Sequence, residues 1–353
     1  MNNRFFKDRK VMITGHTGFI GSWLTKWLSM MNADILGYSL DPPTKPNMYE
    51  AIRLSKDIRD LRKDIRDKRS LKDAIYEFQP ELVFHLAAQP IVLRSYDSPA
   101  ETFDTNIMGT VNLLDILRKT KSTRVIVVMT SDKVYKNNEW VYPYREIDPL
   151  SGKDPYSASK SCQDIVVSSF RESYFARLNV NVSTLRAGNV IGGGDWGEHR
   201  IIPDLVRGLT ENKIVKIRNP ESVRPWQYVL DLVSGMMKLA QRMWGDIKLS
   251  DGWNFGPNNQ REVTVKGLAD RFIEYWGTGS YSVIKGNDEI EANHLELDIS
   301  KAKNKLSWIP KYNFEESVEK TVEWYKEYYR DPSSAYKITE NQINTYLKGQ
   351  NEA

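Results

Sequence analysis

Short apolar runs alternate along the chain with longer stretches whose apolar residues recur at helical spacing. The runs predict strands at Lys10–Thr14, Asp34–Leu40, Glu81–His85, Val125–Met129, Val180–Arg186 and Trp253–Phe255. The helical spacing predicts helices that include Ser70–Phe78, Pro99–Lys119, Ile201–Leu209, Tyr228–Trp244 and Glu315–Tyr329. Strands buried on both faces are continuously apolar, so this alternation predicts an α/β fold with a doubly wound parallel Rossmann sheet.

The pattern becomes less regular after residue 187, where a glycine-rich segment precedes short helices and one short strand, Ile214–Ile217. These segments suit a smaller, mainly C-terminal lobe that covers the strand ends. We expect the Rossmann domain to comprise residues 1–187 plus about 226–256 and the lobe to comprise about 188–225 and 257–345. The polar residues at the carboxyl end, including a tail of 346–353, are expected to fray.

The composition is that of an ordinary soluble globular protein, since 40% of the 353 residues are hydrophobic and 27% are charged. The net charge of +4 is small and the basic residues are dispersed among acids, so neither nucleic acid nor a membrane surface is expected as a partner. A modest positive excess still favours an anionic substrate. A single cysteine, Cys162, suits a reducing cytoplasm, and the four dispersed histidines do not indicate a metal site. A secretion signal and a membrane-spanning run are not expected either.

The first predicted strand runs into a glycine-rich turn, Gly15-x-x-Gly18-x-x-Gly21, which opens a predicted helix. Glycines at this spacing let the backbone turn tightly and approach the pyrophosphate of a dinucleotide, although many strand-to-helix turns need glycine for geometry alone. Asp41 ends the second strand, where a carboxylate binds both ribose hydroxyls and repels a 2′-phosphate. This favours NAD over NADP, and Lys45 close behind leaves the preference open.

Other predicted strand ends also carry residues that suit a ligand. Asp64 and Ile65 follow a short strand and would lie near an adenine, with a solvated charged surface as the equally good alternative. Small residues follow the third strand, and a triple-glycine segment follows the fifth. In open α/β sheets, ligands bind outside the carboxyl ends of the strands, so these positions lean toward binding.

The segment from Thr130 to Lys160 carries the candidate chemistry. Ser131 follows the fourth predicted strand, and Tyr156 and Lys160 stand four residues apart on one helix face. An ammonium beside a phenol favours the phenolate, which makes the tyrosine a usable base near neutral pH. Taken alone, each motif is usually just a solvated helix face or a polar loop. Their position downstream of a dinucleotide fingerprint favours catalysis.

On these motifs, the chain resembles the extended short-chain dehydrogenase/reductase family over essentially its whole length, and within it the CDP-linked group of sugar-nucleotide 4,6-dehydratases. The resembling segments are Gly15–Trp23, Leu40–Pro46, Thr130–Tyr135, Gly192–Trp196, Arg218–Pro220 and Arg224–Gln227. The first three indicate a sugar-nucleotide enzyme, whereas Gly192–Trp196 and Arg224–Gln227 point to the CDP-linked group. The resemblance implies NAD as an internally recycled cofactor and CDP-glucose or a related nucleotide sugar as substrate.

The resemblance also implies roles for five residues. Tyr156 would take the proton of the sugar 4-hydroxyl, Lys160 would stabilise the phenolate and hold the cofactor ribose, and Ser131 would hydrogen-bond the 4-hydroxyl. Asp132 matches the acid of the water-elimination step. Lys133 stands at the base position, where dTDP-glucose and GDP-mannose dehydratases have glutamate and the CDP-linked type has lysine. An ammonium cannot abstract a proton, so the base role requires burial or nearby positive charge to lower its pKa. The alternative is that Lys133 only pairs with Asp132 or a substrate phosphate.

The resemblance extends to residues that would contact cofactor and substrate. Cofactor contacts are expected from Gly15, Thr17, Gly18, Phe19, Ile20, Asp41, Asp64, Ile65, Leu86, Ala87, Ala88, Asn106, Met129, Tyr156 and Lys160. Substrate contacts are expected from Gln89, Arg94, Ser95, Ser131, Asn189, Arg200, Ile202, Pro203, Arg218, Arg224 and His294. The arginines suit phosphate, which guanidinium groups bind bidentately, although most arginines are simply exposed on surfaces.

The family resemblance leaves two rival functions. A sugar-nucleotide epimerase or reductase needs Tyr156 and Lys160 but no acid/base pair beside Ser131, so Asp132 and Lys133 favour a dehydratase. A catalytically silent NAD-binding regulator typically lacks the tyrosine or the lysine, and this chain has both. Dehydration of a dTDP-, GDP- or UDP-linked hexose also stays open. Family members commonly pair through the tyrosine helix and a neighbouring long helix, so a homodimer or homotetramer is expected.

Overall fold

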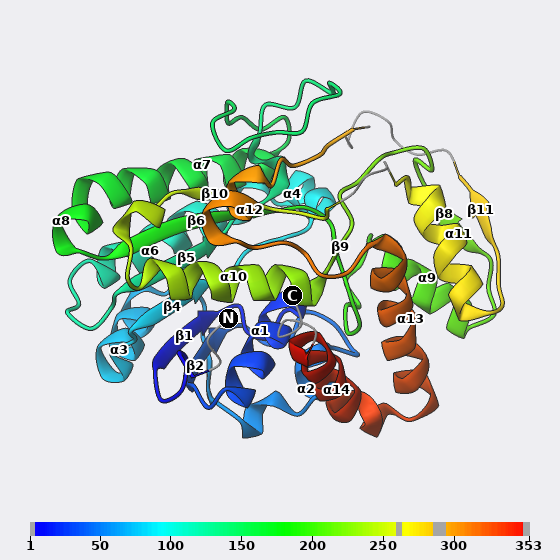
Figure 1. Ribbon diagram of the computed structural model, residues 1–353, viewed down its shortest axis with the longest axis horizontal. Helices are drawn as coiled ribbons and strands as arrows, with labels where there is room; N and C mark the ends of the chain where they lie inside the picture. The colour runs from blue at the N-terminus through cyan, green and yellow to red at the C-terminus, as the bar shows by residue number, and fades with distance from the viewer. Residues whose placement is uncertain (1–3, 259–262, 285–293, 349–353) are drawn as a thin grey trace.

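A seven-stranded parallel sheet forms the centre of the protein in the computed structural model, which describes residues 4–258, 263–284 and 294–348 (Figure 1). The strand order is β10-β6-β5-β4-β1-β2-β3, and every neighbouring pair is parallel. The strands are β1 Lys10–Thr14, β2 Asp34–Ser39, β3 Arg59–Arg62, β4 Leu82–His85, β5 Val125–Met129, β6 Asn181–Ala187 and β10 Gly252–Phe255. Helices cover both faces, which confirms the predicted doubly wound Rossmann sheet.

Side chains of each strand alternate between two apolar cores, one on each face of the sheet. In β1, Val11 and Ile13 join the core that contains α1 (Phe19–Met30) and α10 (Val229–Met243), whereas Met12 joins the opposite core. The helices of that opposite core are α3 Lys68–Phe78, α6 Gly109–Leu117 and α7 Pro155–Phe170. Because both faces are apolar, the central strands β1, β4 and β5 appear in the sequence as apolar runs.

The helix predicted over Pro99–Lys119 forms with an interruption. It consists of α5 (Pro99–Phe103), a π-helical turn (Asp104–Met108) and α6, in unbroken succession. The turn shifts the helical register by one residue and buries Asn106 completely. Apolar spacing predicts a helix but does not reveal a single wide turn within it, so the sequence indicated a continuous element.

A smaller group of elements lies beside the sheet, at the right of Figure 1. It contains α9 (Ile201–Thr210), α11 (Val265–Trp276) and α13 (Phe314–Arg330), together with β8 (Val215–Ile217) and β11 (Tyr281–Val283), which pair in parallel. A second parallel pair joins β7, Val190–Ile191, to β9, Gln227–Tyr228, between this group and the sheet. The domain boundaries given above stay a prediction, and residues 259–262 and 285–293 of the expected lobe lie outside the described part.

The carboxyl end was expected to fray, and this prediction is wrong for the residues described. Ala335–Lys348 forms α14, which buries Ala335, Ile343 and Tyr346 against the core around α1 and α10. The Tyr346 ring meets Trp27 edge-on, with centroids 5.5 Å apart. The helix is polar on average, but its few apolar residues share one face, so it packs although its composition suggests a solvated tail. The last five residues of the expected tail lie outside the described part.

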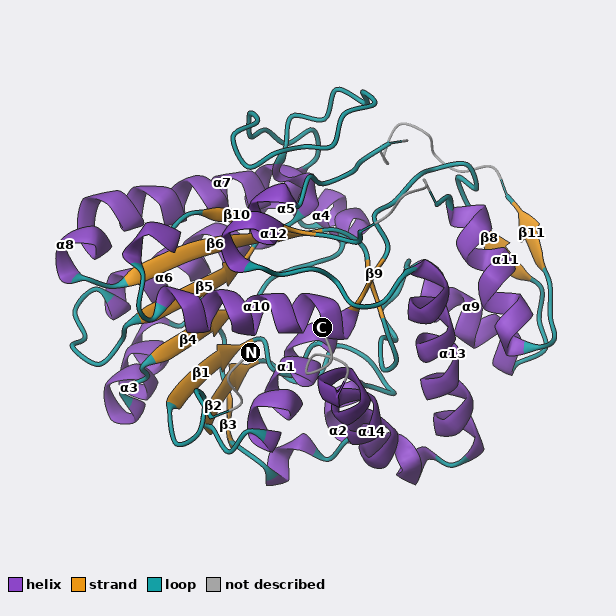
Figure 2. Ribbon diagram, in the orientation of Figure 1, coloured by secondary structure: helices purple, strands orange, loops and turns teal. Residues whose placement is uncertain are grey.

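The remaining elements are short. They are α2 Met48–Ala51, α4 Val92–Asp97, α8 Ala176–Leu178 and α12 Ser300–Leu306, with 3-10 turns at Leu54–Lys56, Asp132–Val134, Ile247–Leu249 and Pro332–Ser334 and a second π-helical turn at Arg171–Phe175. Figure 2 shows how much of the chain at the carboxyl edge of the sheet is loop. Within the described residues, no helix is both long and apolar enough to cross a bilayer.

Candidate active site

A cleft of about 1490 Å³ lies over the carboxyl ends of the sheet strands, between them and the smaller group of elements. Most of the residues predicted to bind cofactor or substrate line it. From the cofactor set these are Gly15, Thr17, Gly18, Phe19, Ile20, Asp41, Asp64, Ile65, Leu86, Ala87, Ala88, Met129, Tyr156 and Lys160, and from the substrate set Gln89, Arg94, Ser131, Asn189, Arg200, Ile202, Pro203, Arg218 and Arg224. The catalytic candidates Asp132 and Lys133 line it as well. One cavity therefore brings together residues from the whole length of the sequence.

The glycine turn after β1 admits no larger residue at two of its positions. Gly15 has φ +78°, and a Cβ there would lie 2.7 Å from the Ala87 nitrogen. A Cβ on Gly21 would lie 2.1 Å from the Gly15 oxygen. The turn thus lies directly against the backbone after β4, and α1 begins at the cleft wall with Phe19 and Ile20. This geometry fits phosphate groups of a dinucleotide at the start of a helix.

The two acidic residues predicted at the adenosine end differ in availability. The Asp41 side chain is 90% exposed, with the Arg62 guanidinium 4.0 Å away. Asp64 instead holds Arg66 through a 2.6 Å hydrogen bond, and this bond, opposed in part by burial, lowers the pKa of the Asp64 carboxyl. Asp41 is therefore open to a ribose, whereas the Asp64 carboxylate is already engaged.

The residues after β5 form a tight polar turn. Ser131 Oγ donates to Asp132 Oδ1 at 3.0 Å and accepts from the Lys133 backbone N–H at 3.2 Å. Lys133 Nζ lies 3.3 Å from the same Asp132 oxygen. Asp132 Oδ2 is buried and has no hydrogen-bond partner among the described residues. Leaving a buried carboxylate oxygen unpaired is costly, so this atom fits a site that a ligand completes.

Tyr156 sits in the first turn of α7, which Asp154 caps by accepting the Ser157 N–H at 2.9 Å. Its own N–H donates to Ser95 Oγ at 3.1 Å. Burial raises the pKa of the Tyr156 phenol, and the Lys133 charge and a Ser131 hydrogen bond oppose that rise. The sequence predicts that Lys160 favours the phenolate, but the charge with the largest lowering effect on this pKa belongs to Lys133.

Lys160 lies one turn further along α7 and is almost completely buried. Its Nζ donates to Gln163 Oε1 at 2.9 Å and to the Met129 carbonyl at 3.3 Å. Burial lowers the pKa of the Lys160 ammonium to about 7. Gln163 in turn donates to Thr110 Oγ1 at 2.8 Å, so the lysine is held in place from behind the cleft.

Three predicted contact residues do not line the cleft. Ser95 and Asn106 are fully buried beneath its floor, where Asn106 Oδ1 accepts the Gln89 N–H at 2.8 Å and its Nδ2 donates to Ser159 Oγ at 2.8 Å. His294 forms a backbone bridge with Val223 outside the cleft lining. Ser95 and Asn106 therefore hold residues that line the cavity, Tyr156 and Gln89, while other residues of α4 and of the π-helical turn, such as Arg94 and Thr105, line it directly.

The structure also reveals polar residues that sequence reasoning missed. Arg186 and Asp164 form a buried ion pair at 2.8 Å directly behind the turn after β5, with Thr130 and Tyr135 bonded to it. Two signals were available: Asp164 lies one helical turn past Lys160, and Arg186 is the one charged residue of its strand. A charge in a buried strand requires a partner, which the sequence alone does not identify. Among the described residues, no cluster of three or more His, Cys, Asp or Glu is arranged to hold a metal ion.

Comparison with known proteins gives consistent matches. A family model described as GDP-mannose 4,6 dehydratase matches residues 12–321. The chain is 45% identical over 337 residues to a CDP-glucose 4,6-dehydratase of Salmonella typhimurium strain LT2, covering 94% of each protein. It is 27% identical over 351 residues to a dTDP-glucose 4,6-dehydratase of Shigella flexneri, covering 90% of this chain and 92% of that protein.

Solved structures share the fold. A UDP-glucose 4-epimerase from Thermotoga maritima with UDP-glucose has a TM-score of 0.77 and 26% identity, covering 90% of this chain and 99% of that one. A double mutant of dTDP-glucose 4,6-dehydratase from Streptomyces venezuelae with NAD bound has a TM-score of 0.79 at 22% identity, covering 90% and 97%. Because its sequence identity is only 22%, the similarity to the Streptomyces structure shows a shared fold and nothing more.

Proposed function

Because this chain belongs to the GDP-mannose 4,6 dehydratase family, we propose that it converts CDP-D-glucose to CDP-4-keto-6-deoxy-D-glucose. The proposed sequence of steps is oxidation at C4, elimination of water from C5 and C6, and hydride return to C6. The observation that carries the substrate assignment is the similarity to a CDP-glucose 4,6-dehydratase over nearly the full length of both proteins. Asp132 and Lys133, which follow Ser131, would supply the acid and the base that water elimination needs.

NAD is the cofactor of this proposal, and when bound it accepts the C4 hydride and returns it to C6. The glycine turn of Gly15 and Gly21 would hold its phosphates, because both glycines line the cleft and let the turn pack backbone against backbone at the start of α1. The exposed carboxylate of Asp41 would bind the adenosine ribose. Lys160, whose Nζ lies at the Met129 carbonyl, would bind the second ribose.

The C4 step needs a base at the sugar 4-hydroxyl. Tyr156 Oη would take that proton, and the Lys133 charge together with the Ser131 hydroxyl favours the phenolate form. Ser131 Oγ would also hydrogen-bond the 4-hydroxyl and orient it. Burial of the tyrosine keeps water from competing for the same proton.

The elimination step needs an acid at the C6 oxygen and a base at C5. The buried Asp132 Oδ2, which has no partner among the described residues, would donate the proton to the leaving hydroxyl. Lys133, a third exposed at the cleft wall, would take the C5 proton once the 4-keto group has made it acidic. In this structure Lys133 forms an ion pair with Asp132. The elimination therefore requires that one proton first pass from the Lys133 ammonium to the Asp132 carboxylate, which leaves a neutral amine as base and a carboxylic acid as donor.

We further propose a homodimer or homotetramer that works in the cytoplasm. Ile165 on α7 and Met108 in the neighbouring π-helical turn are 55% and 47% exposed. Apolar side chains in such positions suit packing between the helices of two subunits.

Incubation with a panel of nucleotide sugars tests the substrate. CDP-glucose should yield a product that absorbs after alkali treatment and has lost the mass of one water, whereas dTDP-glucose, UDP-glucose and GDP-mannose should yield little. Tyr156→Phe serves as the inactive control, because it removes the phenol oxygen and keeps the ring. Turnover of another hexose nucleotide without turnover of CDP-glucose would overturn the assignment.

A further inference from the structure

We infer that the buried Asp164–Arg186 ion pair is a positioning unit that sets Asp132 and Lys133 relative to Tyr156 and Lys160. The inference rests on the proposed function, since it assigns the pair to the elimination step of that reaction. Neither Asp164 nor Arg186 lines the cleft. They act through the residues that do.

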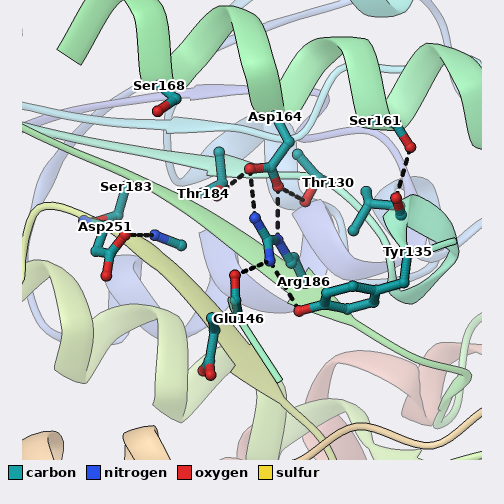
Figure 3. A network of polar contacts seen from close by, with 12 residues as sticks. Thr130, Tyr135, Glu146, Ser161, Asp164, Ser168, Ser183, Thr184, Arg186 and Asp251 are labelled. Carbon is teal, nitrogen blue, oxygen red and sulfur yellow. Dashed lines mark hydrogen bonds and ion pairs between the residues drawn. The ribbon is translucent and has the colours of Figure 1, made fainter. Parts of the chain in front are cut away.

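The pair itself has a single, fully bonded geometry (Figure 3). Arg186 Nε donates to Asp164 Oδ2 at 2.9 Å, and its Nη2 donates to Oδ1 at 2.8 Å. Each side chain is 5% exposed. A bidentate guanidinium–carboxylate contact fixes orientation as well as distance, so the two side chains form one rigid unit.

The ion pair is hydrogen-bonded to the residues on both sides of the turn Ser131–Val134, called the catalytic turn below. Thr130, immediately before Ser131, donates to Asp164 Oδ2 at 3.2 Å. Tyr135, two residues after Lys133, accepts from Arg186 Nη1 at 2.9 Å. Figure 3 shows both side chains directed at the pair from opposite ends of the turn. Any tilt of the pair would therefore move the intervening segment.

The same unit is built on the helix that carries the other half of the site. Asp164 lies one turn after Lys160 and two turns after Tyr156 on α7. Ser161 of this helix donates to the Val134 carbonyl at 2.8 Å and so adds a third tie to the turn. The pair thereby fixes the residues proposed for C4 oxidation, Tyr156 and Lys160, relative to the catalytic turn, which carries those proposed for water elimination.

Further hydrogen bonds add to the directional hold on the pair. Thr184 donates to Asp164 Oδ1 at 3.1 Å, and Arg186 Nη1 also donates to the Glu146 carbonyl at 3.1 Å. Apolar residues of similar size can match a buried ion pair in stability, but they cannot supply these directional bonds. The pair therefore contributes orientation that a buried apolar pair of equal stability would not.

Two conservative variants test this on the holoenzyme. Tyr135→Phe and Thr130→Val each remove one hydroxyl that ties the turn to the pair, and they leave no buried charge unpaired, as Asp164→Asn would. We expect each to lower kcat about 10-fold, and the double variant about 100-fold, with KM for CDP-glucose within about twofold of wild type. Neither variant changes the start of α7, so Tyr156 should keep its position and C4 oxidation should continue. Because water loss and hydride return are slowed, reduced cofactor should accumulate in a single turnover.

A matched control separates positioning from general destabilisation. Lys26→Met removes a buried lysine that pairs with Asp57 and Glu340, remote from the cleft lining. It should lower the melting temperature while the ratio of C4 oxidation to water loss stays at the wild-type value. If Tyr135→Phe and Thr130→Val behave like this control, or keep wild-type kcat, the inference is wrong. Failure of the wild-type protein to turn over CDP-glucose would instead overturn the proposed function.

Discussion

Lys133 has two effects on the site that separate variants can distinguish. Its charge is the largest influence that opposes the burial-driven rise in the pKa of Tyr156, and its amine is the proposed base at C5. We expect Lys133→Met to slow water loss about 100-fold or more, because a positioned base contributes rate factors of this size. The rise of C4 oxidation with pH should also move to higher pH, since the phenol loses its stabilising cation. Stopped-flow absorbance of reduced cofactor and mass spectrometry of the product measure the two steps.

Lys133→Arg is the matched variant. A guanidinium keeps the positive charge but does not release its proton at working pH. The pH profile of C4 oxidation should then resemble that of wild type, while water loss stays slow. A Lys133→Arg enzyme that dehydrates at the original rate would disprove the base role.

Lys160 links the site to the stability of the protein. Burial lowers its pKa to about 7 in the folded state, whereas an exposed lysine in the unfolded chain titrates at 10.5. Between these values the unfolded chain binds a proton that the folded protein does not, so this residue makes stability increase as pH rises. Below pH 7 the folded protein carries the full cost of a buried ammonium.

The expected consequence is a pH-dependent difference between Lys160→Met and wild type. The advantage of the variant in free energy of unfolding should be largest at and below pH 7 and should shrink by up to about 1.4 kcal/mol per pH unit on the way to pH 10. Urea unfolding of nucleotide-free protein at several pH values measures it. Parallel curves for the two proteins would show that Lys160 titrates as an ordinary lysine.

At the residue scale, the sequence predicted the groups that reach the cleft better than those that hold them. Tyr156, Lys160 and Ser131 belong to motifs with fixed spacing, so they could be recognised without a structure. Asp164 and Arg186 come from a helix and a strand whose pairing depends on the tertiary fold. Chain spacing carries no signal for such a contact.

The turn between β1 and α1 offers a test at the scale of one element. Gly21→Ala would place a Cβ 2.1 Å from the Gly15 oxygen, so the helix must move away from the turn. We expect a loss of about 1–3 kcal/mol in the free energy of unfolding from this overpacking. NAD affinity should fall as well, because the backbone that would face its phosphates is displaced. Calorimetric titration and thermal unfolding measure the two effects.

Gly245→Ala is the control, because a Cβ there meets no atom within 4 Å. It should leave both NAD affinity and stability close to wild type. If Gly21→Ala binds NAD as tightly as this control, the close packing of α1 against the glycine turn is not needed for NAD binding.

The sequence predicted helices and strands best where a single signal, such as a continuous apolar run, marks the element. The central strands β1 and β5 are apolar on both faces, and both have the predicted bounds. The π-helical turn before α6 was missed because one added residue barely disturbs a helical pattern. The helix α14 was missed because its composition is polar, while its buried face depends on α1 and α10, which are distant in the chain.

At the scale of the whole molecule, α14 closes the protein rather than trailing from it. Tyr346 donates to the buried Asp231 carboxylate at 2.6 Å, and Tyr228 donates to Gln342 Oε1 at 2.7 Å. The doubly wound parallel sheet could be predicted from the alternation of strands and helices, which is a local signal. The docking of a terminal helix depends instead on a complementary surface formed by distant elements, here α1 and α10. The polar sequence of α14 carries no local signal for that surface.

Truncation after Ser334 therefore should destabilise the molecule as a whole. It uncovers Trp27 and removes the Tyr346 bond from Asp231, whose pKa burial already raises to about 6. Each buried apolar side chain lost or uncovered costs about 1.5–3 kcal/mol, so several together approach the whole stability of a domain. We expect loss of cooperative thermal unfolding, measured by circular dichroism. Truncation after Lys348 keeps α14 and should unfold like the full chain, and equal behaviour of the two truncations would show that the helix contributes nothing to the fold.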